Sequence, residues 1–228
     1  MVRWILLVLT RALPLLLPRT AAPRTDRLAA PACRLLGSAG ERTLQQRYGT
    51  GDRARRFYDA QVLDHLNDAM RAFVARQEFM FLATSDARGN CDSTFRAGPP
   101  GFVHVLDDHR LAWPDYRGNG VMASLGNISE NPRVGLLFLD FGADGVGLHV
   151  NGAATIVDDA VLRADHPDLP VETAPTRRTT RWVVADVHEA YIHCSKFIPR
   201  LRSDGTGPRR GRSDYFVRQH APARTTSR

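Results

Sequence analysis

The sequence is almost without lysine and has little cysteine. Of its 31 Lys and Arg residues 30 are Arg, and Lys196 is the one lysine. The three cysteines, Cys33, Cys91 and Cys194, are odd in number and lack the paired spacing of a metal or redox site. A disulfide framework is therefore not expected. This favours a reducing compartment, and we expect a cytoplasmic protein.

Motifs of several common sites are also missing from the sequence. The eight histidines form no HxH or HExxH pattern and no pairing with cysteine, so no metal site is expected. There is no Walker loop, no GxGxxG after a strand and no GxSxG elbow. These absences argue against a P-loop enzyme, a Rossmann dehydrogenase and an α/β-hydrolase.

No apolar run is long enough to cross a bilayer. The most apolar segment, residues 1–18, is interrupted by Arg11 and Pro14, so no stable membrane span is expected. The same interruption makes this segment only a weak candidate for a secretory signal. We expect residues 1–40 to be a disordered or spurious extension, and residues 202–228 to be a disordered basic tail.

Acidic residues are fewer than basic ones, and the formal net charge is +7. The excess lies at the two ends, because residues 1–40 carry a net +5 and residues 200–228 a net +6. The region between them, residues 41–199, has a net charge of −4. A nucleic-acid-binding domain concentrates its basic residues on its folded surface. Specific nucleic-acid binding is therefore not expected.

What the sequence does contain is a series of short strand patterns. A helix is expected over 41–48, ended by Gly49, and an amphipathic helix over 58–78, where apolar residues recur at helical spacing. Seven strands separated by turn residues are expected at 79–85, 91–97, 102–106, 111–114, 134–141, 146–157 and 181–194. A helix from Val121 and a short acidic helix at 159–165 are inserted among them.

This order predicts a fold dominated by β-structure. Hairpin connections indicate an antiparallel, Greek-key β-barrel over residues 41–201, with short helices packed outside. Closing the sheet also removes exposed strand edges. Gly147 and Gly152 within one strand predict a bulge, or a place where a ligand approaches the backbone.

The candidate binding site is the stretch WPDYRGNGVMASLGNISENPRV, residues 113–134. Hydrogen-bond donors and glycines precede a short helix there, an arrangement suited to a phosphate. The residues concerned are Tyr116, Arg117, Gly118, Asn119 and Ser124. Taken alone, a sequence of this kind more often forms a surface turn with a solvated arginine.

The second strand and the end of the last one supply further candidates. Arg96 alternates with Thr94, so the two share one strand face, and Phe95 and Ala97 take the other. Such a strand can line a planar ligand or present a polar outer face. Lys196 can meet an anion. The adjacent His193 and Cys194 lack the third, orienting group of a nucleophilic site.

Taken in order, four segments resemble the pyridoxamine 5'-phosphate oxidase-like family of FMN-binding split barrels. They are FMFLATSDARGNCDSTFRAGPPGF, LAWPDYRGNGVMASLGNISENPRVGLLF, GLHVNGAATIV and EAYIHCSKFIP, and the resemblance covers roughly residues 41–201. It implies a six- or seven-stranded split barrel and a homodimer with FMN at the subunit interface. It also implies an FMN-dependent oxidoreductase that transfers a hydride or electrons between flavin and a small organic substrate or nicotinamide.

The resemblance carries over to named residues. In this family the flavin phosphate is held from the second strand and from the loop before the inserted helix, which implies Arg96, Tyr116, Arg117, Asn119 and Ser124. The flavin ring lies against the second strand, here Ser93, Thr94, Phe95, Arg96 and Ala97. Contacts from the last strand of a partner subunit would come from Trp182 or Lys196.

The end of the barrel departs from the family's vitamin B6 oxidases. Those carry an Arg-rich substrate signature, where this chain has HCSKFIPRL, so pyridoxamine phosphate is not the implied substrate. Two alternatives stay open: a deazaflavin-dependent reductase on the same fold, and a non-catalytic flavin- or haem-binding module. A bound flavin carries the redox chemistry itself, so an enzyme of this kind needs no catalytic triad.

Overall fold

The computed structural model describes residues 37–171 and 177–201 of the chain. Two compact units are distinguished, residues 1–51 and residues 52–228. In the first unit, α1 (Ala39–Tyr48) begins with a capping box between Ser38 and Glu41 and ends at Gly49 in the left-handed conformation. The helix expected over 41–48 is confirmed. The predictions for residues 1–36 and 202–228 lie outside the described residues.

Two helices follow, α2 (Gly51–Gln61), which begins on the last residue of the first unit, and α3 (Asp68–Ala75). The sequence predicted one amphipathic helix over 58–78, and that prediction is wrong. The chain leaves the helical path because the backbone of Leu63 pairs with that of Ala190 in the last strand, and Asn67 then caps α3. Backbone pairing with a distant strand here overrides the helical spacing of the apolar residues.

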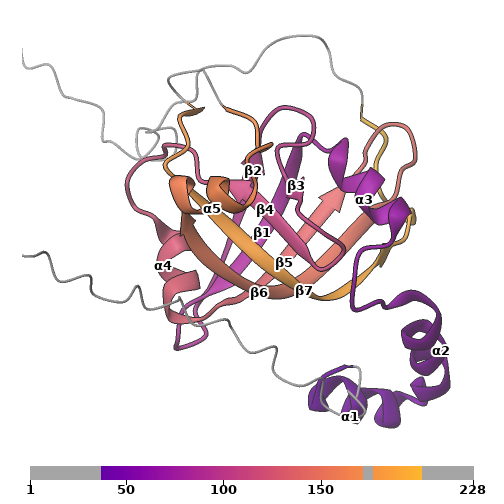
Figure 1. The fold of residues 1–228 in the computed structure, drawn as a ribbon. Coiled ribbons are helices and arrows are strands. Elements are labelled where there is room, and N and C mark those ends of the chain that lie inside the picture. Colours follow the sequence, from indigo (N-terminus) through magenta and orange to yellow (C-terminus); the bar gives the residue numbers. More distant parts are fainter. Residues whose placement is uncertain (1–36, 172–176, 202–228) are drawn as a thin grey trace, which may run out of the picture. The chain divides into compact units, whose positions relative to one another are not determined.

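Seven strands form one antiparallel sheet in the order β2-β1-β5-β6-β7-β4-β3 (Figure 1). They are β1 (Phe79–Ser85), β2 (Cys91–Ala97), β3 (His104–Val105), β4 (Arg110–Pro114), β5 (Arg133–Leu139), β6 (Gly147–Asp158) and β7 (Arg181–His193). The hairpins β1–β2 and β3–β4 lie at opposite ends of this order, and β5–β6–β7 joins them as a meander. The predicted antiparallel, β-dominated fold is confirmed, with β3 shorter than expected.

The main core lies on the inner face of this curved sheet. Alternate residues such as Met80 of β1, Phe138 of β5 and Val150 of β6 are buried there with side chains of α3 and of α4 (Ala123–Glu130). A second, smaller cluster packs Trp182 on the outer face against Leu162 of α5 (Asp159–Asp165). None of the described helices is long and apolar enough to cross a membrane.

The pairing of β6 with β7 contains a bulge. Asn151 pairs with Glu189, but the next residue, Gly152, pairs with Val187, so β7 has one residue more than β6 at this point. A side chain cannot replace the glycine hydrogen, because a Cβ on Gly152 would lie 2.0 Å from the carbonyl oxygen of Asp186. The bulge or close approach predicted at Gly152 is confirmed.

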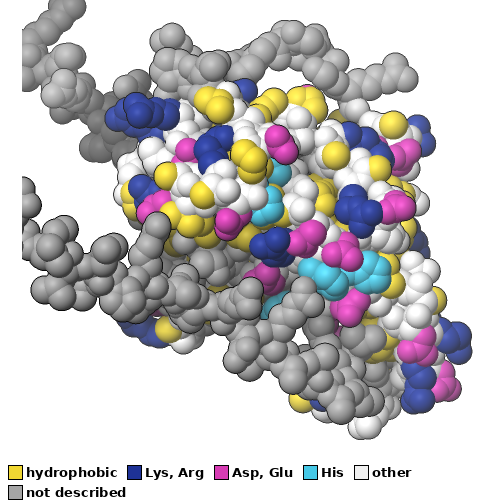
Figure 2. Space-filling view, in the orientation of Figure 1, with side chains coloured by type: hydrophobic (Ala, Val, Ile, Leu, Met, Phe, Trp, Pro, Cys, Tyr) yellow, Lys and Arg dark blue, Asp and Glu magenta, His cyan; other side chains and the backbone are white. Residues whose placement is uncertain are grey.

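The face of the molecule seen in Figure 2 carries acidic, basic and histidine side chains interspersed with one another. Several are paired, as Arg110 Nε is with Asp107 Oδ2 at 2.7 Å. On this face the charges of opposite sign are therefore mixed and do not form an extended patch of one sign.

Candidate functional site

A cavity of about 940 Å³ lies where β2, the loop after β4, the start of α4 and the segment before β7 meet. Pockets that bind small molecules and cofactors measure about 300–1,000 Å³. The cavity is therefore large enough for a ligand well beyond the size of a single phosphate.

Most of the residues predicted to bind a ligand line this cavity. They are Thr94, Arg96, Tyr116, Arg117, Gly118, Asn119 and Ser124. The strand register explains the first two, because Thr94 lies opposite Leu82 and Arg96 opposite Met80. Leu82 and Met80 are core residues, so Thr94 and Arg96 share the inner face of the sheet.

Four other predicted residues are not among those that line the cavity. Ser93, Phe95 and Ala97 alternate with the inward residues of β2, and Phe95 is 57% exposed. Lys196 follows the end of β7, with its Nζ 5.3 Å from the ring centre of Phe197. Their contact with a cofactor stays a prediction. Trp182 is buried, which leaves it no surface for a partner subunit.

Helix α4 begins at the cavity without a side-chain cap. Its N-cap residue, Met122, has φ 57° in the left-handed region, and no side chain accepts a hydrogen bond from the first turn. The first N–H groups of a helix have no partner within it and carry the positive end of its dipole. Because Met122, Ala123 and Ser124 line the cavity, this helix end suits an anion.

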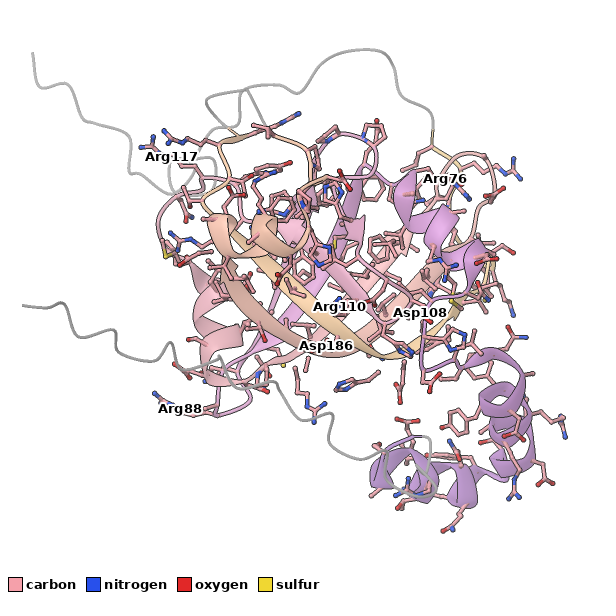
Figure 3. All side chains as sticks on the ribbon, in the orientation of Figure 1. Arg76, Arg88, Asp108, Arg110, Arg117 and Asp186 are labelled. Atoms are coloured by element: carbon pink, nitrogen blue, oxygen red, sulfur yellow. The ribbon has the colours of Figure 1, made fainter. Side chains whose placement is uncertain are left out.

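The loop before α4 contains polar residues that shape its turn or line the cavity. Asn119 Oδ1 accepts a hydrogen bond from the N–H of Val121 at 3.0 Å, so Asn119 shapes the turn as well as lining the cavity. Gly120, with φ 85°, adopts a conformation that favours glycine. Arg117 is exposed at the rim, and Figure 3 shows its side chain far from the group of Asp108, Arg110 and Asp186.

Arg96 is a largely buried cation of the site. Its Nη1 lies 3.7 Å from Oδ1 of Asp115, and the two side chains are only 26% and 18% exposed. Arg96 Nε is buried and has no hydrogen-bond partner within residues 37–171 and 177–201. Leaving such a donor unsatisfied costs on the order of 1–3 kcal/mol. Arg96 lines the cavity, and an anionic oxygen that reached its Nε would satisfy this donor, so the residues present fit a phosphate.

The structure adds five lining residues with polar side chains that the sequence did not single out as ligand contacts. They are Asp92, Asp115, Arg178, Thr180 and Arg181. The N–H of Asp115 donates to the carbonyl of Arg181 at 3.0 Å, which fixes the start of β7 beside the loop after β4. Burial raises the pKa of Asp115, and the positive charges of Arg96 and Arg181 oppose that rise. The guanidinium of Arg181 also approaches Met122, with Nη1 3.9 Å from Sδ.

The charges that line the cavity match a single phosphate monoester. Four arginines and two aspartates give a net charge of +2 when both carboxylates are ionised. The arginines come from β2, the loop after β4, the segment before β7 and the first residue of β7. A phosphate monoester carries about −1.5 to −2 charges at pH 7. The cavity therefore offers charge balance for one such group.

The sequence profile of the family described as pyridoxamine 5'-phosphate oxidase matches residues 66–194. This match covers more than half of the chain and all seven strands. The chain belongs to the pyridoxamine 5'-phosphate oxidase-like family, and its sheet is the split barrel of that family.

Several solved structures are similar to part of the chain. HupZ from Group A Streptococcus is 17% identical over 54% of this chain and 90% of that one, with a TM-score of 0.39. An F420 reductase is 17% identical over 53% and 94%, with a TM-score of 0.37. HutZ, a heme storage protein from Vibrio cholerae, is 13% identical over 56% and 94%, with a TM-score of 0.38. The comparison with curated proteins gave no match.

Proposed function

We propose that the protein is an FMN-dependent oxidoreductase whose cavity holds the flavin phosphate. The observation that carries the proposal is the buried, unpaired Nε of Arg96 in a cavity with a net positive lining. The uncapped start of α4 supports it, because it adds backbone donors to the same cavity. The family is composed mostly of flavin oxidoreductases.

In this proposal each part of the cavity has a separate task. Bound FMN supplies hydride or electron transfer with a small organic substrate or nicotinamide. Arg96, Arg117 and the first N–H groups of α4 bind the phosphate. Thr94 and Ser124 add hydroxyl groups, and the inner face of β2 supports the ring system.

We also propose a homodimer that uses the outer face of the sheet. A row of partly exposed side chains crosses five strands in direct register: Phe95, Phe81, Leu137, His149 and Tyr191. Phe79 extends the row by stacking on Phe95, with ring centres 5.5 Å apart. A contiguous apolar surface of this kind marks an interaction site. A second copy covering it would also approach Ser93 and Ala97 of β2.

The cytoplasm is the compartment that we propose for this activity. The two described cysteines, Cys91 and Cys194, are free and exposed. Exposed thiols persist in a reducing compartment.

A deazaflavin is the second candidate cofactor. Arg178 and Arg181 add two further cations to the lining, from the segment before β7 and from the first residue of β7. A cofactor with a longer anionic tail would use these two arginines, whereas FMN needs only the phosphate site.

A haem-binding module without turnover is the third candidate. The observation that favours it is the pair of His149 Nε2 and His193 Nδ1, 3.0 Å apart on the outer face of the sheet. Neutral imidazole nitrogens are common haem ligands.

Titration of the full-length protein with FMN, F420 and haem separates the three candidates. FMN binding with bleaching of the flavin spectrum by reduced nicotinamide, under anaerobic conditions, is the expected result. Arg96→Ala should abolish most of the FMN affinity, and Arg177→Ala is the matched control, because Arg177 is exposed and does not line the cavity. A protein that binds F420 or haem but not FMN contradicts the proposal.

A further inference from the structure

A carboxylate lies inside the site that is suited to an anion. Asp115 lines the cavity, is mostly buried, and has its Oδ1 3.7 Å from Nη1 of Arg96. Its backbone is held in place, because its N–H donates to the carbonyl of Arg181 at 3.0 Å. An anion that satisfies the buried Nε of Arg96 therefore arrives beside an existing negative charge.

Two acidic groups that share one buried site do not both stay ionised. Their mutual repulsion raises the pKa of at least one, and the pair retains a proton. Burial already raises the pKa of Asp115, so this carboxylate accepts a proton more readily than an exposed one. A phosphate monoester has its second ionisation near pH 6, so it also takes up a proton readily.

The other charged groups of the cavity do not remove the repulsion between Asp115 and a bound phosphate. Arg96 from β2 and Arg181 from β7 are the cations that act on Asp115 and oppose the rise in its pKa. Arg117 and Arg178 line the same cavity, and Asp92 adds a second carboxylate. With both aspartates and the phosphate fully ionised, the lining cations are balanced but the two neighbouring anions still repel each other.

We propose that the cavity binds a phosphate monoester together with one proton, which the phosphate and Asp115 share in an O–H···O hydrogen bond. The proton comes from the solvent, and no other bond forms or breaks. Asp115 is then a positioning residue, because it orients both Arg96 and one phosphate oxygen. This inference rests on the proposed FMN site and adds a protonation state to it.

Calorimetry of FMN binding tests the inference directly. The full-length protein is titrated with FMN slightly above neutral pH, in buffers of different ionisation enthalpy, which gives the number of protons taken up. About one proton per FMN is expected, and Kd should rise by about tenfold per pH unit above the pKa values of the two groups. Riboflavin, which lacks the phosphate, should bind without this uptake.

Two variants locate the proton. In Asp115→Asn the uptake should fall close to zero and the affinity should become nearly independent of pH. In Asp92→Asn, which removes the other carboxylate of the cavity, the uptake should stay near one. The wild-type calorimetry remains decisive if Asp115→Asn fails to fold.

The failures are distinguishable. FMN that binds wild-type protein without proton uptake, or an undiminished uptake in Asp115→Asn, overturns this inference and leaves the flavin site standing. FMN that does not bind at any pH overturns the proposed function and this inference with it.

Discussion

Arg117 is the exposed arginine of the phosphate loop, at the rim of the cavity. A hydrogen bond to a charged group contributes about 1.5–3 kcal/mol, so Arg117→Ala should weaken FMN binding by roughly that amount. Fluorescence titration of FMN measures the change, which corresponds to about a tenfold to a hundredfold rise in Kd. Arg177→Ala should leave the affinity unchanged. An unaltered Kd in Arg117→Ala would show that Arg117 does not bind the phosphate.

Protonation of His149, on the outer face of the sheet, makes the stability of the protein depend on pH. Burial, and then the charge of His193, lower the pKa of His149 below the unfolded value of about 6.5. The unfolded state therefore binds more protons once the pH falls below about 6.5, and the free energy of unfolding decreases there.

His149→Asn should make this loss of stability smaller. Urea unfolding at a series of pH values measures it, and His166→Asn, on the residue that follows α5, is the control. The same pH dependence in His149→Asn and in the wild type would show that another group titrates.

At the scale of single residues the sequence predicted those parts of the site that depend on local alternation. Thr94 and Arg96 face inward because β2 alternates, and that is visible in the sequence. Asp115 lies inside the predicted binding stretch, residues 113–134, whereas its neighbour Arg181 lies outside it. The two meet only because β4 pairs with β7, which no local pattern encodes.

Among the elements, the bulged pair β6–β7 is the most sensitive to substitution. A Cβ at Gly152 would overlap the backbone of Asp186, so Gly152→Ala should destabilise the fold by about 1–3 kcal/mol or more. Chemical denaturation measures the loss. Gly126→Ala is the matched control, since nothing lies within 4 Å of a Cβ there and alanine favours the helix α4. Equal stability of the two variants would contradict the close approach.

Element boundaries were predictable where turn residues separate strands. The predicted 79–85 and 91–97 coincide with β1 and β2, because Asp86 and Gly89 shape a tight turn between them. The helix over 58–78 was not predictable in the same way. Its apolar spacing continues through Leu63 and Leu66, although the backbone of both is bound to other parts of the fold.

At the scale of the whole molecule, the outer row of side chains predicts that the protein forms a dimer. If a second copy covers it, Phe95→Glu should place a charge in the interface and shift the protein from dimer to monomer. Sedimentation velocity over a range of concentrations measures the shift. Val161→Glu, on α5, is the control, because Val161 is similarly exposed but lies outside the row. A wild-type protein that is monomeric at every concentration would contradict the homodimer.

The general architecture was accessible from the sequence, whereas the order of its strands was not. Short strands joined by hairpins predict an antiparallel barrel, and the family profile agrees. Some neighbouring strands, such as β1 and β5 or β4 and β7, are not consecutive in the chain. Which strands become neighbours depends on which surfaces bury each other. That choice also decides where the cavity forms.

Because β7 contains an extra residue, the side chains that it presents to two distant surfaces depend on the number of residues in this one strand. On one side of the bulge Val183 and Val187 point into the core, and on the other side Ala190 does, so the facing sequence changes from odd to even positions. One further residue inserted between Arg181 and Tyr191, beyond the one that the bulge absorbs, would turn either Arg181 out of the cavity or Tyr191 out of the outer row. In descendants of this protein His188 can vary in identity or be lost together with the bulge, but single insertions between Arg181 and Tyr191 should be purged.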